Sequence, residues 1–94
     1  MKPEAKVVKA VMREFRARGG KIIKTTPPGV EDGTPDLIGC LKRRMFCIEC
    51  KARECEPSPL QKKRLEEWSA AGAITMLVWD VRQLIALLDS LKEF

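Results

Sequence analysis

A predicted β-hairpin constrains this chain more than any other feature of its sequence. Residues 36–41 and 45–52 have the character of two strands, and a turn at Lys42-Arg43 would join them. That register places Asp36 directly opposite Glu49. Two facing carboxylates repel each other and destabilise a strand pair by roughly 0.2–1 kcal/mol. A divalent cation between them would reverse the sign of this interaction, so the hairpin predicts a metal site.

A lysine is expected beside the two carboxylates. Side chains alternate between the faces of a strand, so Glu49 and Lys51 point the same way. Mg²⁺ prefers oxygen ligands, which Asp36, Glu49 and the backbone carbonyl of Cys50 could supply. Such an ion makes its bound water a nucleophile near neutral pH, and Lys51 could orient that water or stabilise charge on a phosphate. The combination favours a hydrolytic site over an ordinary solvated hairpin face.

The composition excludes several other kinds of catalytic site. The chain has no histidine and no tyrosine. A Ser-His-Asp triad, a Cys-His pair and a tyrosine nucleophile are therefore impossible. A hydrolase built from this sequence must take its base from a metal-bound water, a carboxylate or a lysine, which are the groups that the hairpin presents.

The remaining sequence predicts a single α/β domain over residues 1–94. Pro3 suits the start of a helix that Gly19-Gly20 ends, and Ser58–Gln61 forms a capping box for a second helix. The apolar run 73–79 predicts a strand buried on both faces, and Asp80 caps a last helix. The predicted elements are a helix over 3–18, a strand over 21–26, the hairpin, a helix over 58–71, a strand over 73–79 and a helix from 81. Their order is α-β-β-β-α-β-α.

The charge distribution indicates a polyanionic partner. The net charge is +5, but residues 1–64 carry 16 Lys and Arg against 8 Asp and Glu. A basic region of this kind is the electrostatic footprint of nucleic-acid binding. The clusters Lys42-Arg43-Arg44 and Lys62-Lys63-Arg64 flank the predicted site and could grip phosphates on either side of it. No aromatic residue lies within these clusters, and both tryptophans, Trp68 and Trp79, are expected in the core.

The cysteines leave a structural zinc site as an alternative. Cys47 and Cys50 form a CxxC, and Cys40 and Cys55 lie close by in the sequence. Alternation along the strand places Cys47 and Cys50 on opposite faces, which disfavours a shared metal. The sequence has no signal segment and no apolar run as long as a membrane span. We therefore expect a cytoplasmic protein with reduced thiols and no membrane association.

The motifs in this order resemble those of the PD-(D/E)XK nuclease superfamily, and most closely those of the VRR-NUC domain. The resemblance covers about residues 3–90. It includes an opening helix that carries a glutamate and ends at Gly19-Gly20. The segments that carry it are Gly33-Thr34-Pro35-Asp36-Leu37-Ile38, Glu49-Cys50-Lys51, Ser58-Pro59-Leu60-Gln61, Trp68 and Ala71-Gly72. The resemblance implies a restriction-endonuclease-like core, with a mixed four-stranded sheet flanked by helices.

The resemblance also implies roles for individual residues. Asp36 and Glu49 would be metal ligands, and Lys51 would be the catalytic lysine. Gln61 would help to place the phosphate or the water, although its position in the capping box also gives it a structural role. The acid of the first helix falls on Glu4, acting directly or through a water, with Glu14 as the alternative.

The function expected from these features is Mg²⁺- or Mn²⁺-dependent endonucleolytic cleavage of DNA. The resemblance implies a structure-specific enzyme of DNA repair that acts on branched DNA such as a Holliday junction. A two-fold symmetric junction suits a homodimer, for which the apolar face of residues 81–91 is one possible interface. The alternatives are a non-catalytic nucleic-acid-binding module, which would use the basic residues alone, and a small zinc-binding protein.

Overall fold

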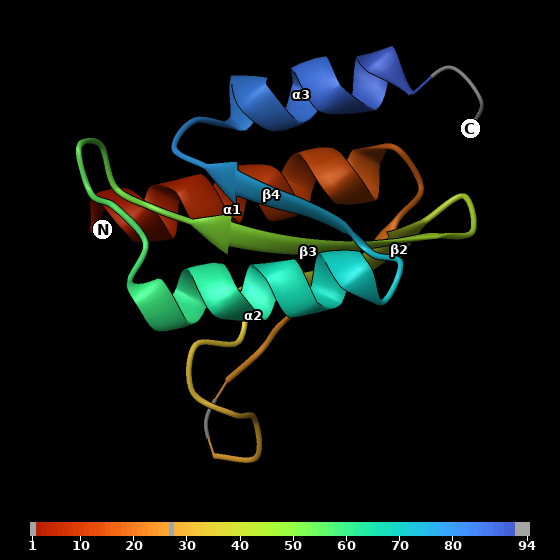
Figure 1. The fold of residues 1–94 in the computed structure, drawn as a ribbon. Helices are drawn as coiled ribbons and strands as arrows, with labels where there is room; N and C mark the ends of the chain where they lie inside the picture. The colour runs from red at the N-terminus through yellow and green to blue at the C-terminus, as the bar shows by residue number, and fades with distance from the viewer. Residues whose placement is uncertain (1, 27, 92–94) are drawn as a thin grey trace.

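The computed structural model describes residues 2–26 and 28–91 and has the predicted element order (Figure 1). Its mixed four-stranded sheet flanked by helices confirms the architecture expected from the sequence. The elements are α1 (Pro3–Ala17), β1 (Lys21–Lys24), β2 (Leu37–Leu41), β3 (Arg44–Cys50), α2 (Pro59–Ala70), β4 (Ile74–Val78) and α3 (Val81–Ser90).

The four strands form one mixed sheet in the order β1-β2-β3-β4. The first three strands are antiparallel, and β4 runs parallel to β3. The hairpin between β2 and β3 turns at Lys42 and Arg43, so Leu41 pairs with Arg44. Both turn residues have positive φ, 48° and 72°, as the two central positions of a tight hairpin turn require.

Helices cover both faces of the sheet. Helices α1 and α3 pack side by side on one face, and α2 lies on the other (Figure 1). Beneath α1, the ring of Phe15 meets Phe46 edge to face, with centroids 5.3 Å apart. A Cβ at Gly39 would lie 2.8 Å from the Phe15 ring, so glycine permits the close approach of the helix to β2.

Helix α2 covers only part of its face, because it packs mainly against β4. The part over β1 and β2 carries exposed apolar side chains. Ile23 pairs with Ile38, and Cys40 pairs with Met45. The exposed fraction is 52% for Ile23 and 38% for Met45. We call these four residues the open sheet face.

Three details differ from the sequence prediction. Strands β1 and β3 end earlier than predicted, at Lys24 and Cys50. The prediction that residues 73–79 are buried on both faces is wrong: most of β4 is half-buried, because it is an edge strand. Trp79 is also only half-buried, and its indole Nε1 donates to the carbonyl of Cys55 at 2.7 Å. This bond ties the loop after β3 to the end of β4.

The apolar face of α3 is turned toward the inside of the molecule. Leu84 and Leu88 are buried in the core cluster, and Val81, Leu87 and Leu91 pack against it. Their burial in the core leaves little of this face for the dimer contact suggested by the sequence. Within the described residues, no helix is both long enough and apolar enough to cross a membrane.

Candidate active site

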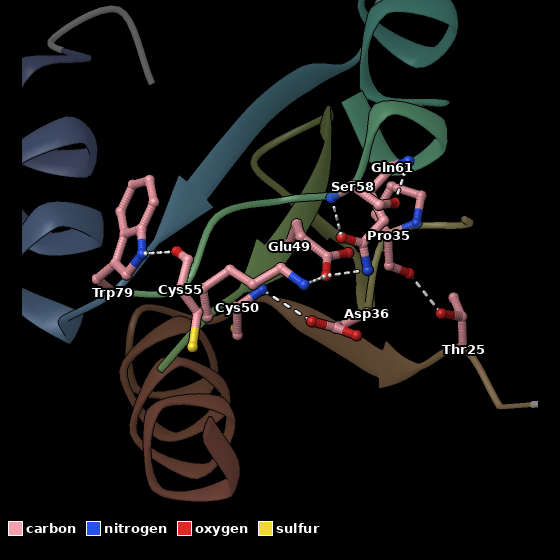
Figure 2. A network of polar contacts seen from close by, with 10 residues as sticks. Thr25, Pro35, Asp36, Glu49, Cys50, Cys55, Ser58, Gln61 and Trp79 are labelled. Carbon is pink, nitrogen blue, oxygen red and sulfur yellow. Dashed lines mark hydrogen bonds and ion pairs between the residues drawn. The ribbon is translucent and has the colours of Figure 1, made fainter. Parts of the chain in front are cut away.

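The acids, the lysine and the glutamine singled out in the sequence meet at one end of the sheet, where β3 ends and both α1 and α2 begin. Figure 2 shows Asp36, Glu49 and Gln61 turned toward one another there. Glu4, Asp36 and Glu49 each contribute a carboxylate oxygen, and these oxygens lie within 4.8 Å of one another. Glu14 lies three turns further along α1, where it pairs with Arg18 at 2.8 Å. The structure therefore brings Glu4, and not Glu14, to the acids of the hairpin.

Asp36 is held by backbone groups on both sides. It lies one residue before β2, where the hairpin register places it beside Glu49. Its Oδ2 accepts a hydrogen bond from the amide of Cys50 at 2.8 Å. Thr25 anchors the preceding segment, because its hydroxyl donates to the carbonyl of Pro35 and its amide donates to the carbonyl of Asp36. The sequence analysis missed Thr25, since only the β1–β2 register brings it beside Asp36.

Glu49 is a carboxylate buried with one oxygen unpaired. Only 1% of the residue is exposed. Its Oε2 lies 3.4 Å from Nζ of Lys51 and accepts a hydrogen bond from Nε2 of Gln61 at 3.1 Å. Its Oε1 has no hydrogen-bond partner among the described residues, although a buried oxygen of this kind normally has one. An oxygen buried beside two further carboxylates fits a cation ligand, so the donor set suits Mg²⁺ or Mn²⁺.

Burial and charge together shift the pKa of Glu49. Its pKa is raised from 4.5 to about 7, mainly by burial and then by the charge of Asp36. The ammonium of Lys51 acts in the opposite direction. A divalent cation would favour the ionised form and offset the repulsion between the carboxylates.

Lys51 occupies the expected place on the same face as Glu49. Its backbone amide donates to the carbonyl of Val78 at 2.9 Å, which extends the pairing of β3 with β4 by one residue. The side chain is 14% exposed. The ammonium is therefore confined next to the carboxylates while remaining open to a ligand.

Gln61 makes the capping contacts expected from the sequence and also contacts Glu49. The side-chain Oε1 of Gln61 accepts from the backbone amide of Ser58 at 2.8 Å. The backbone amide of Gln61 donates to the Ser58 hydroxyl at 3.1 Å, which completes the capping box. Its Nε2 remains available and donates to Glu49 (Figure 2). Helix capping and orientation of Glu49 therefore use different atoms of one amide and do not compete.

The cysteines do not form a metal site. Cys50 belongs to the core cluster on the α1 side of the sheet, and Cys47 faces the other way, as alternation predicts. Burial raises the pKa of Cys47 to about 11 and that of Cys50 to about 12, which keeps both thiols protonated. Among the described residues, the only group of three or more potential ligands is Glu4, Asp36 and Glu49.

The two basic clusters lie in different surroundings. Lys42, Arg43 and Arg44 are exposed at the hairpin tip, about 16 Å from Glu49 by the rise of a strand. On α2, Lys62 and Lys63 are exposed. Arg64 has other contacts: its guanidinium lies 3.4 Å from Glu31 and 3.0 Å from Glu67 and donates to the carbonyl of Asp32. It therefore ties the loop before β2 to α2.

Comparison with solved structures finds the same architecture. A structure described as a VRR_NUC domain superposes with a TM-score of 0.82 and 28% identity, covering 97% of this chain and 99% of the other. A VRR_NUC domain protein matches with a TM-score of 0.73 and 21% identity, over 99% and 90% of the two chains. Hjc of Archaeoglobus fulgidus, a Holliday junction resolvase, shares the fold with a TM-score of 0.62 and 18% identity, over 81% and 67%.

No protein-family model matches the sequence, and no curated protein matches it significantly. The structural match to the VRR_NUC domain extends over nearly the full length of both chains. The resemblance to the VRR-NUC domain found in the sequence is therefore confirmed by a solved structure that is 28% identical and matches over nearly the full length of both chains.

Proposed function

We propose that this domain is a metal-dependent endonuclease that hydrolyses phosphodiester bonds of branched DNA. The observation that carries the proposal is the unpaired, buried Oε1 of Glu49 beside the carboxylates of Asp36 and Glu4. A non-catalytic binding module has no use for a buried carboxylate with an unpaired oxygen beside two further carboxylates, an arrangement that is unfavourable without a cation.

The residues of the proposed site have different roles in metal binding and catalysis. Asp36 and Glu49 would hold Mg²⁺ or Mn²⁺ together with the Cys50 carbonyl, and Glu4 would bind directly or through a water. Such an ion supplies a nucleophilic water near neutral pH and polarises the phosphate. Lys51 stabilises the negative charge that builds on the phosphate as the bond breaks. Gln61 holds Glu49 in position through the hydrogen bond at 3.1 Å.

The proposed substrate is a four-way junction. The fold shared with an archaeal Holliday junction resolvase supports this class of DNA. The direct test is cleavage of a labelled junction beside linear duplex, splayed arm and single strand, in Mg²⁺, in Mn²⁺ and in EDTA. Paired symmetric nicks in the junction alone, lost in EDTA, would support the proposal. Equal cutting of every substrate would remove the junction preference, and metal-independent binding without cutting would favour the binding module.

A junction with two-fold symmetry needs two cuts, so we propose that the domain acts as a homodimer. The open sheet face is the better candidate for the contact, because it exposes Ile23 and Met45 whereas the apolar face of α3 is buried. Light scattering of the wild type is expected to give twice the chain's mass of 10.6 kDa. Ile23→Glu should give the monomer mass, because a charge on this face opposes its burial. A dimeric Ile23→Glu protein would place the contact elsewhere.

The double role of Gln61 can be separated by a matched pair of variants. Ser58→Ala removes the capping hydroxyl and leaves Glu49 untouched, so it should cost about 1 kcal/mol of stability and preserve cleavage. Gln61→Ala removes the capping box and also the hydrogen bond to Glu49, so it should lower cleavage as well. Urea unfolding and single-turnover cleavage measure the two effects. Equal cleavage by both variants would restrict Gln61 to a structural role.

A further inference from the structure

A basic groove runs along the exposed side of α1 beside β1. It encloses about 590 Å³. Six residues line it, and four of them carry a positive charge: Ala5, Lys9, Met12, Arg13, Arg16 and Lys24. We call it the α1–β1 groove. None of these residues belongs to the two basic clusters singled out in the sequence, and none is required by the chemistry at Glu49.

Helical spacing places the groove residues of α1 on one face. Lys9 and Arg13 are four residues apart, and Arg16 follows three residues later, so like charges are neighbours. Such like-charged neighbours destabilise an isolated helix. Lys24 faces them from β1. Cations brought together from two elements favour the binding of an anion.

Within the described part of the chain, no carboxylate neutralises these four cations. Lys9, Arg13 and Lys24 form no ion pair there, and Arg16 donates only to the carbonyl of Ile22, at 3.3 Å. By contrast, Arg18, at the end of the same helix, is paired with Glu14 and Asp89. The groove is therefore a local concentration of positive charge whose cations have no ion-pair partner among the described residues.

The α1–β1 groove continues into the candidate active site. A second cavity, of about 290 Å³, shares Ala5 and Lys24 with it and reaches Glu4 and Asp36. An extended polyanion with one phosphate at the acids would therefore have a continuous path along α1. Between Lys9 and Arg16 this path is about 10 Å long by the rise of a helix, which corresponds to about three stacked nucleotides of one strand.

We propose that the α1–β1 groove holds the sugar-phosphate backbone of a DNA strand on one side of the cleaved bond. The inference rests on the proposed nuclease function for the identity of the polyanion. The lining of the groove offers positive charges for phosphates and no aromatic side chain on which a base could stack. It therefore fixes where the strand leaves the active site.

The test measures DNA binding rather than cleavage. A labelled four-way junction and a linear duplex are titrated in EDTA at several salt concentrations, with fluorescence anisotropy as the readout. The variant Lys9→Gln/Arg13→Gln removes two exposed cations of the groove. It should weaken both complexes about tenfold and lower the slope of log K against log salt by about 2, since each lost phosphate contact removes about one unit.

Two further variants make the result specific. Lys24→Gln removes the cation that lines the groove from β1, and it should lower the slope of log K against log salt by about 1. Arg82→Gln removes a cation on α3 that is paired with Asp80 at 2.8 Å, and it should leave the slope unchanged. Thermal unfolding shows that each variant is folded. Unchanged binding by folded Lys9→Gln/Arg13→Gln and Lys24→Gln, or an equal loss in Arg82→Gln, would overturn the proposal.

The outcomes separate this inference from the proposed function. If the wild type binds DNA through the groove but cuts no substrate, the DNA-binding role of the groove is supported and the proposed nuclease function is refuted. If the wild type cuts DNA and the groove variants bind DNA as tightly as it does, the nuclease function is supported and the DNA-binding role of the groove is refuted. The groove could instead dock an acidic protein segment, and this alternative would also give groove variants with unchanged DNA affinity.

Discussion

Replacing Lys51 by methionine should lower the single-turnover rate of junction cleavage by about 10²–10³ while DNA binding in EDTA changes little. Its ammonium is held 3.4 Å from Glu49, and 14% of the side chain is exposed, so it can reach a phosphate bound beside the acids. Methionine keeps much of the length of the side chain but cannot stabilise developing negative charge, and the loss of one such group has an effect of this size. Cleavage under excess enzyme, with Mg²⁺ at saturation, gives the rate.

A matched control separates the chemistry from a general loss of charge. Arg82→Met removes one cation from α3, on the opposite side of the sheet from α2 and outside the proposed site, and should cleave at the wild-type rate. Asp36→Asn should be at least as impaired as Lys51→Met, because it removes a proposed metal ligand that is held in place by the Cys50 amide. A wild-type rate of cleavage by Lys51→Met would show that Lys51 has no catalytic role.

The free energy of unfolding of the metal-free domain should fall as the pH rises. Glu49 has a pKa of about 7 in the folded chain, against an ordinary value of 4.5. The folded state therefore holds the proton more tightly than the unfolded state. This stabilising contribution is complete below pH 4.5 and is lost as the pH rises through about 7. A shift of this size corresponds to about 3 kcal/mol. Urea unfolding in EDTA across this range measures the loss.

Glu49→Gln is the control, because glutamine does not titrate. Its stability should change less with pH than that of the wild type over the same interval. Above pH 7, Mg²⁺ or Mn²⁺ should stabilise the wild type strongly and the variant weakly, since the cation favours the ionised carboxylate. If the free energies of unfolding of the two proteins changed in parallel with pH, the assignment of a raised pKa to Glu49 would be wrong.

Local geometry explains why much of this site could be predicted from sequence. Alternation along one strand is enough to place Glu49 beside Lys51, and a two-residue turn fixes which residues of β2 and β3 face each other. The capping box that begins α2 depends only on residues three apart, Ser58 and Gln61. These rules act over a few residues, so the sequence contains all the information they need.

Other features depend on packing between distant parts of the chain. The hydrogen bond from Gln61 to Glu49 requires α2 to dock against the end of β3. The α1–β1 groove requires Lys24 to lie opposite α1, and neither charge pattern nor spacing shows that. The open sheet face exists because α2 covers only the β4 side of the sheet, and β4 is half-buried because it lies at the sheet edge; sequence patterns show neither.

The hydrogen bond from the Lys51 amide to the Val78 carbonyl has a consequence for how activity appears during synthesis. A growing chain contains Asp36, Glu49 and Lys51 well before it contains β4. Until Val78 has been added and β4 has docked along β3, the backbone at Lys51 lacks the partner that fixes its direction. A nascent domain should therefore not acquire the proposed nuclease activity until its sheet is complete.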